Sequence, residues 1–389
     1  MRNNIVFLGC TQDYPYCFSA CNTKVELISR GLILQGDRCC IINSIVGSKL
    51  VKKKTESQND YQINHITYPF YANQLISWIC NIKKLYQDLQ NYKSDKYKNI
   101  LILEAPDYHI YLLYIILGRL LGYKISIIAH EWLPTIKSTH ILRKPSVWLY
   151  ATTFGYLADG IMPISRYIDL KTDKFKKKKM RLPILAEFNN NEEQLLLSTE
   201  NIENGYFLYC AFAAYFRVIT FIADTYKYFC DMGGKQQLIM VLSGSQEDIN
   251  KVVNYLKRIG INDRVLLRSK LPYNELTAYY KKAIALLIPL CPNSEQDKAR
   301  FSQKIAEYLS SYRPIISTNV GEINEYFTDK QNIILASEYS IESFCNALQF
   351  AIKDYEIANK IGYEGRLLGE KEFDFKKNGK KLHLFFNEL

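Results

Sequence analysis

The chain has 389 residues, of which 48% are hydrophobic and 23% charged, and its formal net charge is +11. This composition excludes a disordered or fibrous chain, and the length exceeds what one hydrophobic core usually supports, so we expect two domains. The ten cysteines include no Cys-x-x-Cys pair, and no set of His, Asp and Cys residues has ligand spacing. We therefore expect reduced thiols, a cytoplasmic location and no bound metal or cofactor.

Strands and helices are predicted to alternate over residues 1–185. The apolar run from Asn4 to Leu8 predicts a first strand, and a helix is expected over about 23–35, ended by Gly36. The first apolar run is too short for the core of a signal peptide. Further strands are predicted at 38–45, 65–68, 100–103, 125–129, 160–163 and 181–185.

The most apolar stretch covers residues 108–123 and contains His109 and Arg119. It is shorter than the roughly 20 residues that a membrane span requires. We expect it to be a core helix with one solvent-facing edge.

The alternating pattern stops in residues 187–205, which are acidic and rich in Asn, as in a connection between domains. A second series then predicts strands at 206–211, 238–243, 264–268, 284–289, 315–318 and 333–336, followed by three helical segments, the last near 376–387. This order predicts two doubly wound α/β domains. We expect a first domain at 1–185, a linker at 186–204, a second domain at 205–370, and a C-terminal helix at 371–389 that packs back on the first domain.

The excess of Lys and Arg lies entirely in the first half, largely in Lys52 to Lys54 and in residues 171–181. Such clusters attract anionic phospholipid or nucleic acid phosphates, and a single cluster is also consistent with a solvated surface. Because no recognised basic and aromatic motif is present, nucleic acid binding is the least favoured interpretation.

Residues 300–325 carry the strongest functional signal in the sequence. Lys304 and Glu307 share one face of a short helix, while Ile305 and Leu309 form an apolar stripe. The β-branched run 315–318 then suits a buried parallel strand. A helix start before such a strand can bind an anion. The alternative is an ordinary surface ion pair between Lys304 and Glu307.

This arrangement resembles the C-terminal signature of GT-B glycosyltransferases of the retaining family 4 type, also called glycosyl transferases group 1. The residues that match are Lys304, Glu307, Pro314, Ile315, Ile316, Thr318 and Gly321. Residues 159–168, 238–247 and 271–290 resemble other segments of that family, so the resemblance spans about 3–370. It implies the GT-B fold, in which two Rossmann-like domains face an interdomain cleft.

The resemblance also implies roles for individual residues. Glu307 would bind the ribose hydroxyls of a nucleotide sugar, and the other donor-binding residues would be Arg217, Arg300, Ser302, Gln303, Lys304 and Gly244. His130, followed by Glu131, resembles the family's His-Asp or His-Glu pair near the anomeric carbon and would be catalytic. The sequence departs from the family pattern at Ala299, which replaces a Glu, and at Phe212, which replaces an Arg.

The resemblance therefore implies a retaining, metal-independent glycosyltransferase that transfers a sugar to a glycan or lipid-linked acceptor in surface polysaccharide biosynthesis. The basic first half would suit peripheral association with the inner face of a membrane. Two alternatives stay open: a catalytically degenerate GT-B protein that supports a partner transferase, and another GT-B enzyme such as a nucleotide-sugar epimerase or a phosphorylase.

Overall fold

The computed structural model describes residues 2–11, 13–16, 19–49, 63–104, 107–136, 141–188, 204–269 and 271–389. The chain forms two compact units. Unit 1 contains Met1–Glu187, Ala299–Gln303 and Glu372–Leu389, and unit 2 contains Phe188–Lys298 and Lys304–Lys371. Of the predicted linker at 186–204, residues 189–203 lie outside the described part of the chain, as do Lys52 to Lys54.

Unit 1 is built on a sheet of seven parallel strands in the order β3-β2-β1-β4-β5-β6-β7. Its strands are β1 (Asn3–Leu8), β2 (Arg38–Ile42), β3 (Asn64–Ile66), β4 (Lys98–Leu103), β5 (Lys124–Ala129), β6 (Gly160–Pro163) and β7 (Lys178–Lys179). Its helices are α1 (Ala20–Ile33), α2 (Gln74–Tyr92), α3 (Tyr108–Leu120), α4 (Lys144–Thr153), α5 (Arg166–Thr172) and α14 (Phe375–Glu388). Short 3₁₀ turns, including one at Asp173–Phe175, join several of them.

The topological switch point of this sheet lies between β1 and β4. Strands β2 and β3 are added on one side of β1, and the chain then crosses over and places β4 on the other side. In open parallel sheets this switch point leaves a crevice outside the carboxyl ends of the strands, where ligands bind. The residues that follow β1, β4 and β5 are therefore the first place to look for chemistry in unit 1.

The sequence-based prediction of a strand at 181–185 is wrong. The last strand of the sheet is the two-residue β7, which pairs with β6 at Gly160 and Ile161. Pro183 lies inside the predicted run, and a proline cannot donate to a sheet ladder, so it is excluded from a regular strand interior. Leu182 still donates to the backbone oxygen of Pro163, but the chain beyond it is irregular.

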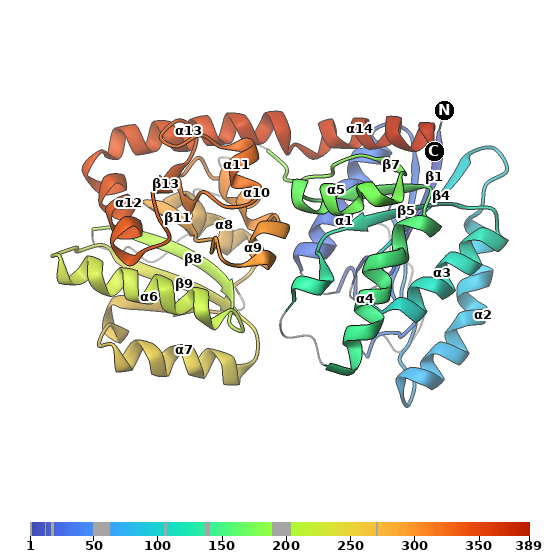
Figure 1. Cartoon of the computed structure of the whole chain (residues 1–389), viewed down its shortest axis with the longest axis horizontal. Coiled ribbons are helices and arrows are strands. Elements are labelled where there is room, and N and C mark those ends of the chain that lie inside the picture. The colour runs from blue at the N-terminus through green and yellow to red at the C-terminus, as the bar shows by residue number, and fades with distance from the viewer. Residues whose placement is uncertain are drawn as a thin grey trace. The chain divides into compact units, whose positions relative to one another are not determined.

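The C-terminal helix α14 packs against α1 within unit 1 (Figure 1). The contact is close because glycines face each other: a Cβ atom placed on Gly31 would lie 2.5 Å from the oxygen of Phe375 and 3.0 Å from the Cα of Gly379. Phe375, Leu382 and Phe386 are fully buried in the same core as the β1 and α1 side chains. The last segment of the chain is therefore part of the core of unit 1.

Unit 2 is built on six parallel strands in the order β10-β9-β8-β11-β12-β13, with a switch point between β8 and β11. The strands are β8 (Tyr206–Phe212), β9 (Gln237–Ser243), β10 (Val265–Arg268), β11 (Ala285–Ile288), β12 (Ile315–Thr318) and β13 (Ile334–Ala336). The helices are α6 (Phe216–Asp231), α7 (Gln246–Arg258), α8 (Tyr273–Lys282), α9 (Glu295–Ala299), α10 (Gln303–Leu309), α11 (Ile323–Tyr326), α12 (Ile341–Lys353) and α13 (Tyr355–Glu372). Helix α9 ends at Ala299 and α10 begins at Gln303, and both of these residues belong to unit 1. The last residue of α13, Glu372, also belongs to unit 1.

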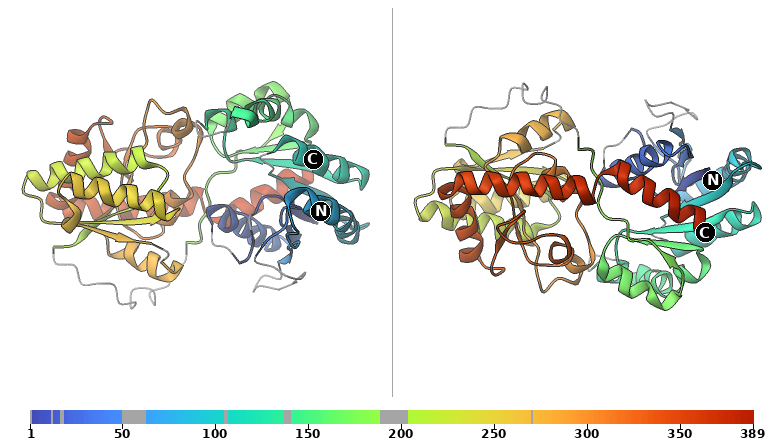
Figure 2. Two further views of the ribbon diagram at one scale, coloured as in Figure 1. Left: turned by 90° about the horizontal axis from the view of Figure 1, so that it is seen from below. Right: turned by 90° about the horizontal axis from the view of Figure 1, so that it is seen from above.

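Helices cover both sides of the second sheet. In the view from below, α6 and α7 lie side by side across one face, whereas in the view from above α13 is in front (Figure 2). The core beneath α6 is apolar and aromatic, with Phe207, Tyr226 and Phe229 among its buried residues. The predicted architecture of two doubly wound parallel sheets is confirmed.

Among the described residues, no helix is both long and apolar enough to span a bilayer. The most apolar candidate, α3, is a core helix as predicted: Tyr111 and Tyr114 are fully buried, while Ile116 and Leu120 face solvent.

Candidate active site

A cavity of about 340 Å³ opens at the switch point of unit 1. Its wall is formed by residues that follow β1, β4 and β5, together with the first turn of α1 and one side of α4. The lining residues are Gly9, Cys10, Thr11, Ser19, Cys21, Glu104, Ile128, Ala129, His130, Glu131, Trp132, Leu133, Tyr150, Ala151 and Phe154. The cavity therefore combines an aromatic wall with a few titratable groups, which is typical of a small-molecule site.

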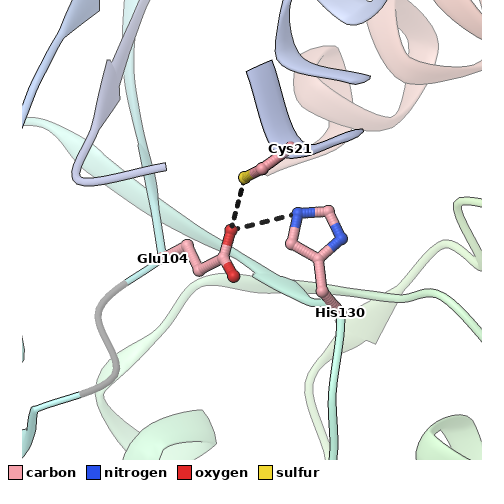
Figure 3. A group of neighbouring side chains, drawn as sticks. All are labelled: Cys21, Glu104 and His130. Atoms are coloured by element: carbon pink, nitrogen blue, oxygen red, sulfur yellow. Dashed lines mark hydrogen bonds and ion pairs between the residues drawn. The ribbon is translucent and has the colours of Figure 1, made fainter. Parts of the chain in front are cut away.

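His130 directly follows β5, and its side chain is only 13% exposed. Its Nε2 lies 3.1 Å from Oε2 of Glu104, the residue that follows β4 (Figure 3). Its other ring nitrogen, Nδ1, lies 3.5 Å from Nζ of Lys24 on α1. The imidazole is thus held between a carboxylate and an amine, and both of its nitrogens face titratable groups.

Cys21 reaches the same carboxylate from the first turn of α1. Its Sγ lies 3.7 Å from Oε2 of Glu104 and donates to the backbone oxygen of Cys10 at 2.6 Å. Burial and then the negative charge of Glu104 raise the pKa of the Cys21 thiol far above its usual value. By itself this thiol is therefore protonated and unreactive.

Lys24 is a buried lysine in the wall behind His130. Burial lowers the pKa of its amine to about 7, although Glu104 and Cys21 act in the opposite direction. The amine donates to the backbone oxygen of Leu182 at 3.4 Å. Because burial disfavours the charged form, Lys24 changes its charge near neutral pH.

Glu131 completes the polar side of the cavity. Burial, and secondly the charge of Glu104, raise the pKa of the Glu131 carboxyl, while His130 and Arg300 lower it. The Glu131 carboxyl is therefore protonated more readily than that of an exposed glutamate.

In unit 2, the predicted pair Lys304 and Glu307 lies on α10, and both side chains are partly buried. The hydroxyl of Tyr280 donates to Oε2 of Glu307 at 3.4 Å. Burial raises the pKa of the Glu307 carboxyl, and the charge of Lys304 and the Tyr280 hydrogen bond oppose this shift. Glu307 is therefore not an ordinary exposed surface carboxylate, because it is desolvated and accepts a hydrogen bond from a tyrosine.

Arg217 is the second residue of α6, beyond the end of β8. Its guanidinium donates to Sγ of Cys291 at 3.0 Å, and Cys291 follows β11. The backbone N–H of Cys291 in turn donates to Asp297 at 3.0 Å. A cation is thus fixed at the switch point between β8 and β11.

Gly244 directly follows β9 and has a backbone φ of +132°, a region that residues with a Cβ atom rarely adopt. A Cβ atom there would also lie 3.3 Å from the ring of Phe212. The glycine is required by the turn and by the closeness of Phe212.

The predicted donor residues are divided between the units. Arg217, Gly244, Lys304 and Glu307 belong to unit 2, whereas Arg300, Ser302 and Gln303 belong to a five-residue segment of unit 1. Within that segment, the amide of Gln303 accepts from the backbone N–H of Leu185 at 3.2 Å and donates to the oxygen of the same residue. Ser165 donates to the oxygen of Ala299 at 2.5 Å. The amide of Gln303 is therefore already engaged by the backbone of unit 1.

Cys21, Lys24 and Glu104 were not predicted from the sequence. The signal was nevertheless present for Glu104, because it directly follows the predicted strand at 100–103, as His130 follows the one at 125–129. Carboxyl ends of neighbouring parallel strands meet at one edge of a sheet. The sequence does not give the order of the strands in the sheet, and this order decides whether the ends of these two strands are neighbours.

Two parallel-sheet units, each with polar side chains at its switch point, define the GT-B class of fold. The model of the family described as "Glycosyl transferases group 1" matches residues 224–368, a range that includes Lys304 and Glu307. Together with the fold, this match indicates that the protein is a glycosyltransferase enzyme. No curated protein sequence matches the chain at a significant level.

Several solved structures share the fold over the full chain. Sucrose-phosphate synthase from Thermosynechococcus elongatus is 12% identical with a TM-score of 0.74, covering 100% of this chain and 99% of that chain. HepE from Anabaena in complex with UDP-glucose is 11% identical with a TM-score of 0.75, covering 99% of both chains. Trehalose-6-phosphate synthase OtsA is 10% identical with a TM-score of 0.76, covering 100% of this chain and 99% of that chain. At these identities the likeness concerns the fold.

Proposed function

We propose that the protein is a retaining, metal-independent glycosyltransferase that moves a sugar from a nucleoside diphosphate donor, preferably a uridine one, to a glycan or lipid-linked acceptor in surface polysaccharide biosynthesis. The observation that carries the proposal is the arrangement of Lys304, Glu307 and Tyr280, inside the segment that matches the glycosyltransferase family. The preference for uridine is supported by the UDP and UDP-glucose complexes of HepE.

Glu307 has the properties of a ribose ligand. A carboxylate can accept from two neighbouring hydroxyls at once, and Tyr280 fixes the orientation of this one. Its partial burial makes each such hydrogen bond stronger than it would be in water.

Lys304 and Arg217 would neutralise the diphosphate. Departure of the nucleoside diphosphate develops the largest negative charge in sugar transfer, and fixed cations lower its cost. Arg217 is suited to bidentate contact with phosphate oxygens, and its hydrogen bond to Cys291 restricts the guanidinium in advance.

The cavity of unit 1 would receive the acceptor. Trp132 and Tyr150 offer aromatic surface, while Glu131 and His130 offer partners for hydroxyl groups. His130 would donate to an oxygen of the reacting sugar or shuttle a proton. Glu104 would stabilise the protonated ring through its carboxylate, 3.1 Å from Nε2.

Unit 1 also carries a surface suited to an anionic bilayer. Ile141, in the short 3₁₀ turn before α4, is 71% exposed, and Trp148, within α4, is 64% exposed. Beyond the C-terminal end of α4, Tyr156 is 56% exposed and packs edge-on against Phe175, whose neighbours Lys174 and Lys176 are exposed. Aromatic and basic side chains together favour the interface of anionic lipid. Binding to phosphatidylglycerol vesicles, lost in Trp148→Glu and kept in the α14 control Leu384→Glu, would support this.

The test of the enzymatic proposal is a thermal-shift measurement with UDP, GDP and ADP. We expect UDP to raise Tm and Glu307→Ala and Lys304→Ala to reduce the shift, with Lys330→Ala, a lysine elsewhere in unit 2, as control. Incubation with UDP-sugars and acceptors, followed by assignment of the anomeric configuration, tests retention. If neither variant changes the shift, the donor site is wrongly assigned.

The thermal-shift measurement and the incubation with UDP-sugars together separate the alternatives. A catalytically degenerate protein is suggested by Ala299 and Phe212. Binding of UDP without turnover on any acceptor would favour that alternative, and formation of an altered nucleotide sugar without an acceptor would favour an epimerase.

A further inference from the structure

Three side chains of unit 1 converge on one point at the wall of the cavity. Cys21 comes from α1, Glu104 follows β4 and His130 follows β5, and Figure 3 shows them pointing toward one another. One ligand atom from each lies within 4.8 Å of the others. Each side chain is partly buried, so none of them is simply an exposed charge.

We propose that Cys21, Glu104 and His130 form a binding site for a zinc-type divalent cation, with the fourth coordination position open to the cavity. The proposal adds a ligand that the sequence did not predict, because the three residues lie on separate segments with no ligand spacing. Occupation of the site by zinc would also inhibit sugar transfer, an effect that rests on the proposed function.

The distances suit a tetrahedral ion. With Zn–S near 2.3 Å and Zn–N or Zn–O near 2.0 Å, neighbouring ligand atoms are separated by about 3.3 to 3.6 Å. Here Sγ of Cys21 lies 3.7 Å from Oε2 of Glu104, and Nε2 of His130 lies 3.1 Å from the same oxygen. The remaining separation, between Cys21 and His130, is at most 4.8 Å, so these two side chains must move closer together around the ion.

The chemistry of the donors selects the ion. A thiolate and an imidazole favour Zn²⁺ or Co²⁺ over Mg²⁺ and Ca²⁺, which require mostly oxygen ligands. The thiolate and the carboxylate together balance the charge of a divalent cation. Lys24 lies beside Nδ1, so Nε2 is the nitrogen turned toward Glu104.

Binding exchanges a proton for the metal. The thiol of Cys21, which donates to the oxygen of Cys10, releases its proton to solvent as the sulfur coordinates the cation. Three protein ligands leave one position of a tetrahedron open, and the 340 Å³ cavity beside them has room for water or a substrate hydroxyl.

The bound cation would occupy Nε2 of His130, a residue that the proposed transferase needs. Zinc is therefore expected to inhibit sugar transfer reversibly by competing for His130, and a chelator to restore activity. The site would make the enzyme sensitive to free zinc without requiring metal for catalysis.

Titration of the metal-free protein with Co²⁺ tests the site without any sugar substrate. We expect one equivalent to produce the near-ultraviolet absorption of a thiolate-bound cobalt ion, and Zn²⁺ to displace it. Cys21→Ser should abolish this absorption, and Glu104→Gln and His130→Ala should each weaken Zn²⁺ binding more than tenfold. The matched control is Cys230→Ser, a thiol of similar burial in unit 2; it should leave binding unchanged.

The result that overturns the proposal is absence of stoichiometric Co²⁺ binding, or binding of equal affinity in Cys21→Ser. Circular dichroism of each variant establishes that it is folded, and Glu104→Gln, which keeps the shape of the side chain, is informative even where Cys21→Ser is unstable. Cobalt binding without a nucleotide shift would refute the transferase proposal alone. Transfer activity without cobalt binding would refute the metal site alone.

Discussion

The amine of Lys24 and the imidazole of His130 face each other at 3.5 Å across the wall of the unit 1 cavity. Lys24 is 3% exposed, and burial lowers its pKa from 10.5 to about 7. The charge of the amine beside His130 therefore changes in the physiological pH range. The stability of unit 1 should consequently depend on pH.

We predict that this coupling is visible when the wild-type protein is compared with Lys24→Met. Between pH 7 and about 10.5 the unfolded chain binds a proton at Lys24 that the folded chain does not bind, so the stability of the wild type should rise with pH. The rise relative to Lys24→Met should be about 1 kcal/mol per pH unit between pH 7.5 and 9. Urea unfolding at several pH values measures it.

Lys83→Met, an exposed lysine on α2, is the control for this experiment and should parallel the wild type at every pH. If the difference between wild type and Lys24→Met stays constant from pH 7.5 to 9, the amine is charged in the folded protein and the buried-lysine argument fails.

The sequence predicts local features of this protein better than features that depend on the order of strands in a sheet. The strand predicted at 315–318 agrees with β12 because a short β-branched run between helices has a local signature. His130 was predicted because it follows the apolar run 125–129 and, with Glu131, resembles a pair of residues in the family. Cys21, Lys24 and Glu104 were missed because their meeting depends on the order β1-β4-β5, which brings together residues more than 80 positions apart.

We predict that His130→Ala lowers kcat at least roughly 100-fold, as expected for loss of an acid-base group, while the UDP-induced shift in Tm is kept. The physical reason is that His130 belongs to unit 1, where it contacts Glu104 and Lys24, whereas the proposed donor residues Lys304 and Glu307 belong to unit 2. Steady-state kinetics on the purified variant give the value. His109→Ala, whose ring packs on Trp78, is the control; a His130→Ala enzyme with normal turnover would remove His130 from the catalytic residues.

The close contact between α1 and α14 leads to a prediction about stability. Gly31→Ala would place a Cβ atom 2.5 Å from the oxygen of Phe375, so the helices must separate, at a cost of about 1 to 3 kcal/mol. Hydrogen exchange should show faster opening of both α1 and α14. Gly260→Ala, where nothing lies within 4 Å, should affect only its own turn. Unchanged exchange in α14 would show that the contact contributes little.

Gln303 offers a test of whether residues 299–303 serve the structure or the donor. Gln303→Met keeps the length of the side chain but leaves the backbone N–H and oxygen of Leu185 without their partner, 118 positions away. Leaving a buried polar group unsatisfied costs about 1 to 3 kcal/mol, so the free energy of unfolding should fall by that amount or more. Ser302→Ala, a partly buried neighbour, should change it by less than about 0.5 kcal/mol.

The nucleotide-dependent measurement decides between the two roles of Gln303. If its amide holds Leu185, as the hydrogen bonds indicate, Gln303→Met should lower Tm equally with and without UDP, so that the shift itself is preserved. If the amide binds the donor, Gln303→Met should leave the free protein as stable as the wild type and reduce only the shift. Because the side chain cannot make both sets of bonds at once, the second outcome would require the segment 299–303 to leave Leu185 when the donor binds.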